Sequence, residues 1–216
     1  MSQKDPIFDV PEGFPRLIEV MRRLRDPEGG CPWDIEQDFA SIAPYTIEEA
    51  HEVADAIERE AWGELEGELG DLVLQVIYHG QMGAEAGHFD TGSIARRITA
   101  KMIARQPHVF GAERGEKSAE QQTRDWEVAK EKERAASGAA RTLDGVALGL
   151  PALLRALKLQ KRLARVGFDW GDPGPVLEKL AEEIHELQEA RQHSQDATED
   201  EFGDILFVLV NLARHW

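Results

Sequence analysis

Apolar residues recur every three or four positions along most of this chain, the spacing of one face of an α-helix. In residues 15–25 that face holds Leu17, Val20, Met21 and Leu24. The same spacing predicts further helices from Thr46 to about residue 58 and at 64–82, 91–105, 151–165, 175–192 and 198–215. No region alternates apolar and polar residues with period two, so we predict no β-strand. The expected fold class is all-α.

Proline and glycine mark the breaks in this pattern. The N-terminal dozen residues are rich in proline and are expected to be extended, and the stretch 26–34 (DPEGGCPWD) separates the first two helices. Glu49 stands three residues after Thr46, which predicts a capping box at the start of the second helix. Gly67 and Gly70 cost the third helix roughly 1 kcal/mol each against alanine. We therefore expect close approach of a neighbouring helix or a ligand there.

The chain repeats one acidic phrase. EEAHE at 48–52 is followed by ELGD at 68–71, and EEIHE at 182–186 is followed by EFGD at 201–204. An offset of 134 residues from Glu49 to Glu183 is too long for a solenoid and indicates a duplicated helical domain. We predict a first repeat at 1–111, a charged linker at 112–145 with a helical stretch around Trp126, and a second repeat at 146–216. The flexible joint is placed at 138–140 and 144–145.

The amino-acid composition excludes several classes of protein. Of 216 residues, 42% are hydrophobic, and 41 acidic against 25 basic residues give a net charge of -16. Such a surface repels nucleic acid, so broad DNA or RNA binding is not expected. A single cysteine, Cys31, excludes a disulfide framework within one chain. No signal-peptide or membrane-spanning stretch is seen, so we expect a soluble cytoplasmic protein without a membrane partner.

The doubled carboxylates are the strongest chemical signal. Residues three and four apart share a helix face, so each phrase places like charges side by side, which destabilises a helix unless something neutralises them. Mg²⁺ and Mn²⁺ prefer such oxygen ligands and reverse the penalty. A single EExxE run is usually a solvated helix face. Two copies at matching spacing instead predict divalent-metal sites and, with them, phosphate chemistry.

Three other residues are weaker candidates. Lys101 and Arg105 lie four apart on one predicted helix and could hold a triphosphate, although alone they would be solvated charges. Trp33 could stack on a nucleobase, and a core position is an equal alternative.

Several segments together resemble the MazG-type nucleoside triphosphate pyrophosphohydrolases. They are CPWDIEQ at 31–37, IAPYTIEEAHEV at 42–53, ELGDLVLQV at 68–76, RQPHVFG at 105–111, LPALLRALKLQKRLARVGFDW at 150–170 and EFGDILFVLVNLARH at 201–215. The resemblance covers nearly the whole chain in a two-repeat form. It implies all-α four-helix units, assembly as a homodimer or higher homo-oligomer, and a house-cleaning role. The implied reaction is Mg²⁺-dependent hydrolysis of NTP or dNTP to the monophosphate and pyrophosphate, with Mn²⁺ as a substitute.

The resemblance also assigns the site. It implies metal ligands at Glu49, Glu52, Glu68 and Asp71 in the first repeat, and at Glu183, Glu186, Glu201 and Asp204 in the second. It implies that Lys101 and Arg105 bind the phosphates. Glu48 adjoins the ligands without being needed as one, which makes it the candidate general base. Trp33 is the candidate base-stacking residue.

The chain departs from the family pattern after residue 215. Relatives are expected to continue into a helix with a second Lys/Arg pair, so on the residues present only the first repeat is complete. This keeps two alternatives open. One is a non-catalytic helical module for nucleotide binding, metal binding or dimerisation. The other is a pyrophosphohydrolase with a narrow substrate, such as a dUTPase-like or phosphoribosyl-ATP-like enzyme.

Overall fold

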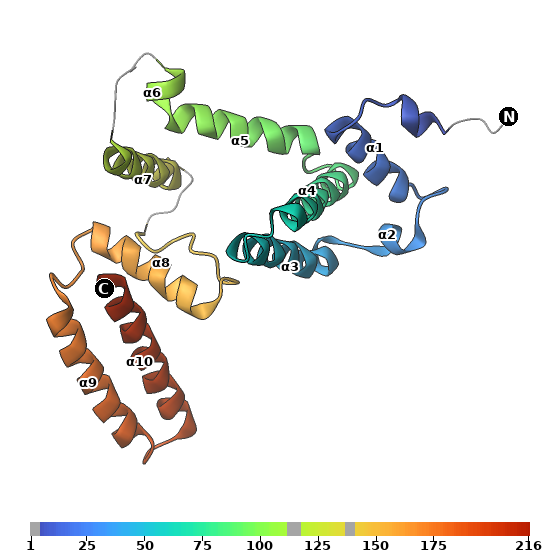
Figure 1. Ribbon diagram of the computed structural model, residues 1–216. Coiled ribbons are helices and arrows are strands. Elements are labelled where there is room, and N and C mark those ends of the chain that lie inside the picture. The colour runs from blue at the N-terminus through green and yellow to red at the C-terminus, as the bar shows by residue number, and fades with distance from the viewer. Residues whose placement is uncertain (1–4, 112–117, 137–140) are drawn as a thin grey trace. The chain divides into compact units, whose positions relative to one another are not determined.

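Helices are the only regular elements in the described part of the chain, which confirms the all-α expectation. The computed structural model describes residues 5–111, 118–136 and 141–216, apart from the side chains at 134 and 135. In order, the elements are η1 (Pro6–Asp9), α1 (Phe14–Leu24), α2 (Pro32–Glu36), α3 (Phe39–Glu58), α4 (Trp62–Glu85), α5 (Thr91–Arg105), α6 (Pro107–Phe110), α7 (Ala119–Ala136), α8 (Ala152–Arg165), α9 (Pro173–Ala190) and α10 (Gln195–His215). Figure 1 labels the helices along the chain. None of those described is long and apolar enough to cross a bilayer.

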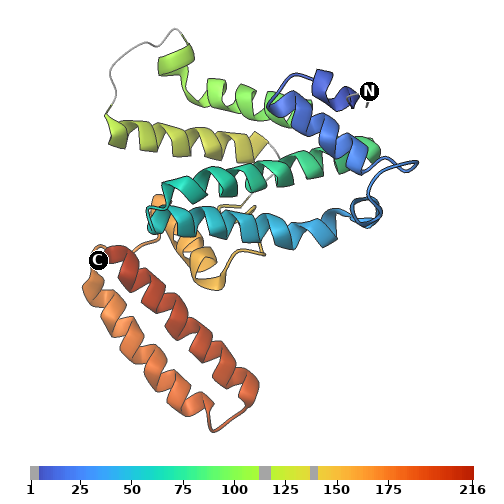
Figure 2. The same cartoon turned by 45° about the vertical axis from the view of Figure 1, so that its right-hand side comes forward.

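The chain divides into two compact units, Met1–Glu116 and Lys117–Trp216. In the first unit, α3 and α4 are joined by a three-residue turn and form a long helical hairpin, seen side by side in Figures 1 and 2. Helices α1 and α5 pack against α4. The core of this unit is formed by Met21, Ile42, Ile77, Tyr78 and Met82. The two helices of this hairpin therefore carry the two parts of the first acidic phrase, 48–52 on α3 and 68–71 on α4.

The second unit repeats the hairpin with α9 and α10, and α8 packs against α10. Its buried cluster is smaller, consisting of Val176, Val208 and Leu212 with Leu180 packed against them. The helical stretch predicted around Trp126 is α7, and an ion pair of 2.7 Å joins Arg165 of α8 to Glu127 of α7. The joint predicted at 138–140 lies outside the described residues.

The predicted start of the second helix is wrong. Helix α3 begins seven residues before Thr46, because Asp38 and Ser41 form a reciprocal capping box. Pro44 lies inside the helix and removes the N–H that the Ala40 carbonyl would accept, but Ala40 is exposed and water can replace that donor. Thr46 instead ties α3 to α4, since its hydroxyl lies 2.9 Å from His79 Nε2.

Two smaller expectations also need correction. The N-terminal segment is not wholly extended, because Pro6–Asp9 form a 3-10 turn capped by the Asp5 carboxylate. Gly67 and Gly70 do not mark close packing with a neighbouring helix. A Cβ built at either position meets no atom of the chain within 4 Å. The opposite holds at Gly83 of the same helix, where a Cβ would lie 2.5 Å from the Phe89 ring.

Candidate functional site

The first acidic phrase converges on one point of the α3–α4 hairpin. Glu49 of α3 and Glu68 and Asp71 of α4 each offer a carboxylate oxygen, and these three atoms lie within 4.8 Å of one another. Glu68 and Asp71 are three residues apart and so share a face of α4, while the hairpin brings Glu49 to meet that face. Three hard oxygen donors at this separation form a set that suits a divalent cation.

The electrostatics of this cluster follow from its geometry. Desolvation, followed by repulsion from Asp71 and Glu52, raises the pKa of Glu49. Desolvation, followed by repulsion from Glu52 and Asp71, raises the pKa of Glu68. Asp71 and Glu52 thus make ionisation of Glu49 and Glu68 less favourable. A bound cation would remove that repulsion, so the donor set fits a metal ion electrostatically as well as geometrically.

The second unit forms a matching cluster on the α9–α10 hairpin. Carboxylate oxygens of Glu183, Glu186 and Glu201 lie within 4.8 Å of one another. Desolvation is the largest cause that raises the pKa of Glu186, and Glu183 adds repulsion. Desolvation and repulsion from Glu186 and Glu183 raise the pKa of Glu201. Glu183 is buried in the chain, at 4% exposure, whereas Glu49 at the matching position is half-buried.

The two triads share two positions and differ in the third. Glu49 and Glu68 match Glu183 and Glu201, and the third member is Asp71 in the first unit but Glu186 in the second. Two of the eight predicted ligands, Glu52 and Asp204, lie outside the triads. Both still raise the pKa of a triad member, Glu52 at Glu49 and Glu68, and Asp204 at Glu201. They therefore border the clusters, and their role as ligands stays a prediction.

A lysine distinguishes the second cluster. Lys179 Nζ lies 2.8 Å from Glu183 and 2.7 Å from Glu182. The matching residue in the first unit, four positions before Glu49, is Tyr45, which carries no positive charge. The second cluster therefore contains a tethered ammonium that the sequence analysis did not single out. Its spacing of four from Glu183 on one helix was the available signal.

The remaining predicted residues lie around the first cluster or on α5. Glu48 is exposed on α3, beside Glu49, and contributes to the raised pKa of Glu49. Trp33 is half exposed on α2 and meets Tyr45 edge to face, with ring centroids 6.3 Å apart. It is therefore not a core residue. This aromatic pair lies one helical turn ahead of Glu49, since Tyr45 precedes it by four residues.

The two basic residues of α5 have different surroundings. Lys101 is exposed, whereas Arg105 is buried at 8% exposure near the C-terminal end of the helix. The contacts of α5 with α4 include Thr91 beside Gly80, at the end of α4 far from Glu68. The binding of phosphate by Lys101 and Arg105 stays a prediction.

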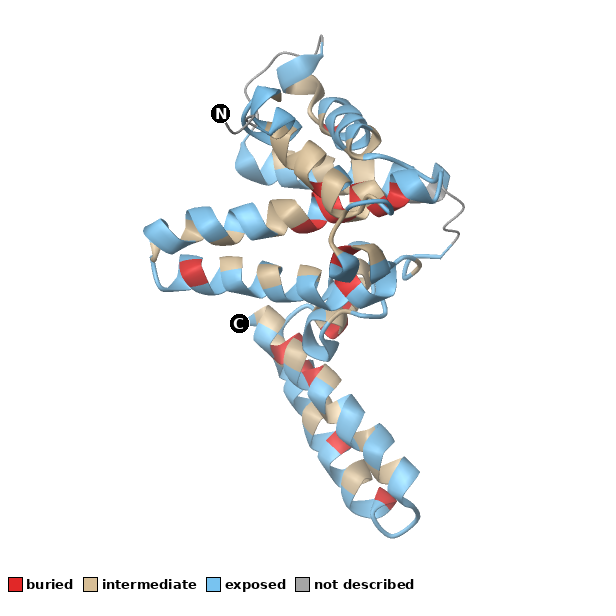
Figure 3. Ribbon diagram, turned by 90° about the vertical axis from the view of Figure 1, so that its right-hand side faces the viewer, coloured by how far each residue is buried: buried red, intermediate tan, exposed pale blue. Residues whose placement is uncertain are grey.

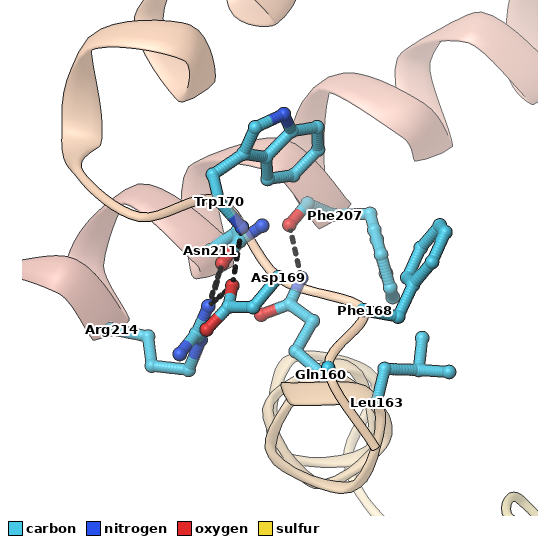
Figure 4. Close-up of a pocket in the computed structure, with 9 residues that line it drawn as sticks. Gln160, Leu163, Phe168, Asp169, Trp170, Phe207, Asn211 and Arg214 are labelled. Carbon is cyan, nitrogen blue, oxygen red and sulfur yellow. Dashed lines mark hydrogen bonds and ion pairs between the residues drawn. The ribbon is translucent and has the colours of Figure 1, made fainter. Parts of the chain in front are cut away.

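Sequence reasoning missed a cavity in the second unit. It measures about 260 Å³ and lies between α8, α10 and the loop after α8. Figure 4 draws Gln160, Trp170 and Asn211, lining residues that come from these three segments. The only sequence signal was the GFDW segment at 167–170, where Trp170 takes a place like that of Trp33.

Comparison with known proteins identifies relatives that match most of the chain. Residues 37–110 match the MazG nucleotide pyrophosphohydrolase domain, a span that includes the first acidic cluster. The chain is 53% identical over 203 residues to the nucleoside triphosphate pyrophosphohydrolase of Escherichia coli K12, covering 93% of this chain and 77% of that protein. It is 40% identical over 201 residues to the nucleoside triphosphate pyrophosphohydrolase/pyrophosphatase MazG of Thermotoga maritima, with coverage of 93% and 75%. A nucleoside triphosphate pyrophosphohydrolase of Mycolicibacterium smegmatis is 32% identical over 172 residues, with coverage of 78% and 52%.

Proposed function

Since the chain belongs to the MazG nucleotide pyrophosphohydrolase family, we propose that it hydrolyses nucleoside triphosphates to the monophosphate and pyrophosphate with Mg²⁺, as a house-cleaning enzyme of the nucleotide pool. The observation that carries the proposal is the pair of carboxylate triads, one on each hairpin. Desolvation, followed by repulsion from neighbouring carboxylates, raises the pKa of Glu49 in the first triad and of Glu201 in the second, which favours a cationic ligand at both places. Relatives of this family from Escherichia coli and Thermotoga maritima carry the name of this activity.

Each part of the site has a proposed task. Glu49, Glu68 and Asp71 hold the cation in the first unit, and Glu183, Glu186 and Glu201 hold it in the second. When bound, the cation neutralises charge on the phosphate oxygens and so supplies electrostatic stabilisation. Mn²⁺ should replace Mg²⁺, since both take carboxylate oxygens.

The proposed proton and substrate contacts involve other side chains. Glu48 accepts the proton of the attacking water, because it stands exposed beside Glu49. Lys101 and Arg105 donate to phosphate oxygens. Trp33, exposed and paired with Tyr45, offers an aromatic face for a base in the first unit.

We propose that the protein acts as a homodimer or higher homo-oligomer in the cytoplasm. Support for assembly comes from large apolar side chains left exposed on the hairpins, among them Phe202 at 54% and Trp62 at 64% exposure. Helices with wide apolar faces need a partner to cover them.

The test is hydrolysis of a panel of NTPs and dNTPs with Mg²⁺, scored separately for pyrophosphate and orthophosphate. We expect pyrophosphate from several nucleotides and a loss of at least about 100-fold in the double variant Glu68→Gln, Glu201→Gln, because one carboxylate leaves each triad. Glu66→Gln is the matched control, an exposed glutamate on α4 outside the triad. Unchanged release in the double variant would refute the site. Turnover of one nucleotide alone would favour a narrow-substrate enzyme, and no turnover would favour a binding module.

A further inference from the structure

We propose that the cavity of the second unit binds the nucleobase of the triphosphate and reads its edge with two buried amides, Gln160 and Asn211. The inference rests on the proposed function and deepens it, because it assigns base recognition to particular side chains. It is carried by the cavity, by an unpaired buried oxygen on one of the side chains that line it, and by the fixed orientation of both amides.

Gln160 presents a hydrogen-bond acceptor. Its side chain is on α8, is 4% exposed, and donates from Nε2 to the Phe207 carbonyl of α10 at 2.7 Å. A carbonyl can only accept, so the amide nitrogen must face Phe207 and the oxygen must face the other way. Among the described residues, Gln160 Oε1 has no hydrogen-bond partner. An unsatisfied buried acceptor costs about 1–3 kcal/mol, which a ligand N–H would recover.

Asn211 presents a donor. It is 5% exposed on α10, and its Oδ1 accepts from Arg214 Nη2 at 2.7 Å and from Nε at 3.1 Å. A guanidinium only donates, so the Asn211 oxygen must face Arg214 and its NH₂ group must face away. Arg214 is held in turn by an ion pair with Asp169, and the hydrogen bond from Arg214 lowers the pKa of that carboxyl. The amide is thus fixed by a charged pair that lines the same cavity.

One acceptor and one donor match the edge of a nucleobase. Every base carries a hydrogen-bond donor beside an acceptor on its edge, and the order differs among the bases. Beside the Asp169–Arg214 ion pair, the cavity has apolar walls formed by Leu163, Phe168, Phe207 and Trp170. Aromatic rings stack on any base face, worth about 1–3 kcal/mol for each base. A pocket with stacking walls, in which one amide offers an acceptor and the other a donor, suits several nucleotides rather than one.

The cavity is also correctly placed for phosphates at the second triad. Asn211 is on the same helix as Glu201 of the triad and lies ten residues after it, which is about 15 Å along the axis; Asp204, which borders the triad, lies seven residues before Asn211. Residues seven apart on a helix share a face. A nucleotide whose base is bound at Asn211 would therefore extend its phosphates along α10 towards the carboxylates.

The first unit fills the equivalent place. Tyr78 stands at the position that matches Asn211, 133 residues earlier, the same offset that relates Glu68 to Glu201. Tyr78 is 4% exposed, donates its hydroxyl to the Asp34 carbonyl at 3.0 Å, and packs in the core with Met21 and Met82. Base reading by an amide pair therefore belongs to the second unit, and Tyr78 offers an internal control.

The test measures binding without turnover. The intact chain is titrated with α,β-methylene ATP and, separately, with inorganic tripolyphosphate, both with Mg²⁺, by calorimetry. We expect Asn211→Leu and Gln160→Leu each to weaken binding of the nucleotide analogue at least about tenfold, while the tripolyphosphate affinity changes less than about twofold. Tyr78→Phe should change neither. Retained tripolyphosphate binding shows that a variant is folded.

Trp170→Ala covers the case in which both amide variants fail to fold. Its ring is 38% exposed, so truncation should leave the core intact and still weaken binding of the analogue alone. Analogue binding equal to that of the unchanged chain in either folded amide variant, or in Trp170→Ala, would overturn the proposal. So would equal weakening of analogue and tripolyphosphate. If the analogue binds tightly and both amides are needed, but the protein releases no pyrophosphate from any nucleotide, the proposed function is refuted while the base-binding pocket is supported.

Discussion

The two carboxylate triads have similar sequences but differ in one neighbouring side chain, which is charged in the second unit and uncharged in the first. In the second unit Lys179 forms an ion pair with the buried Glu183, and in the first unit Tyr45 takes that place without a charge. The ammonium neutralises part of the second triad, whereas the first triad has only its own negative charge. Occupation of the second site by a divalent cation must therefore compete with a tethered one.

Removing the lysine should reveal this competition. We expect Lys179→Met to raise the Mn²⁺ affinity of the second site about threefold to tenfold, equivalent to roughly 0.7–1.4 kcal/mol. The metal-free protein should melt at a lower temperature, because Glu183 loses its counter-ion. Calorimetric titration and thermal melts with and without Mn²⁺ measure both effects. Tyr45→Met is the control at the matching position, where no charge changes. A weaker Mn²⁺ affinity in Lys179→Met would show that the lysine supports the metal site instead.

At the level of whole helices, the periodic pattern predicted the long helices but not the short helices α2 and α6. Helix α5 begins and ends where its apolar spacing indicated, because Asp90 and Ser93 cap its start. The start of α3 was missed, since the favoured signal at Thr46 competed with a capping box at Asp38 and Ser41. Both positions carry residues that favour the start of a helix, so the local sequence alone does not show at which of them the helix begins.

The candidate site could be predicted only in part, because some of its features are local in the sequence and others depend on contacts between distant residues. Carboxylates at helical spacing are local features of the sequence, so their convergence followed once the helices paired. The cavity depends on where Gln160 and Asn211, 51 residues apart, meet in space. Tyr78 takes the position of Asn211 in the first unit. Only its packing in the core shows that the first unit has a buried ring where the second has an amide.

The glycines of α4 provide a test of helix energetics. Because a Cβ at Gly67 meets no atom within 4 Å, Gly67→Ala should stabilise the protein by about 1 kcal/mol. Gly83→Ala should destabilise it, since the added Cβ would lie 2.5 Å from the Phe89 ring and 2.8 Å from the Phe89 carbonyl oxygen. Chemical denaturation of both variants measures the difference. If Gly67→Ala is stable but loses pyrophosphate release, a ligand approaches the backbone there.

At the scale of the whole molecule, the apolar surface exceeds what one chain covers. Figure 3, coloured by burial, shows few buried positions along the helices. On α10, Phe202, Leu206 and Leu209 share one face and are 54%, 39% and 42% exposed. On α9, Leu177 and Ile184 are seven residues apart and 45% and 44% exposed. Two hairpins of this kind placed face to face would form a four-helix bundle, which agrees with the proposed dimer.

Disrupting this face should dissociate the assembly. We expect the intact chain to have at least twice its monomer mass by light scattering after size exclusion, and the double variant Phe202→Ser, Leu206→Asn to shift towards monomer. The reason is that polar side chains at two spaced positions remove the apolar contact that drives helix pairing. Leu148→Asn is the control, an 82% exposed leucine outside the hairpin, and should leave the mass unchanged. A monomeric intact chain at all concentrations would contradict the dimer. If the folded double variant keeps the mass of the intact chain, the interface does not involve this face of α10. Because subunit association can be required for a stable fold, the melting temperature of the double variant should also fall and depend on protein concentration.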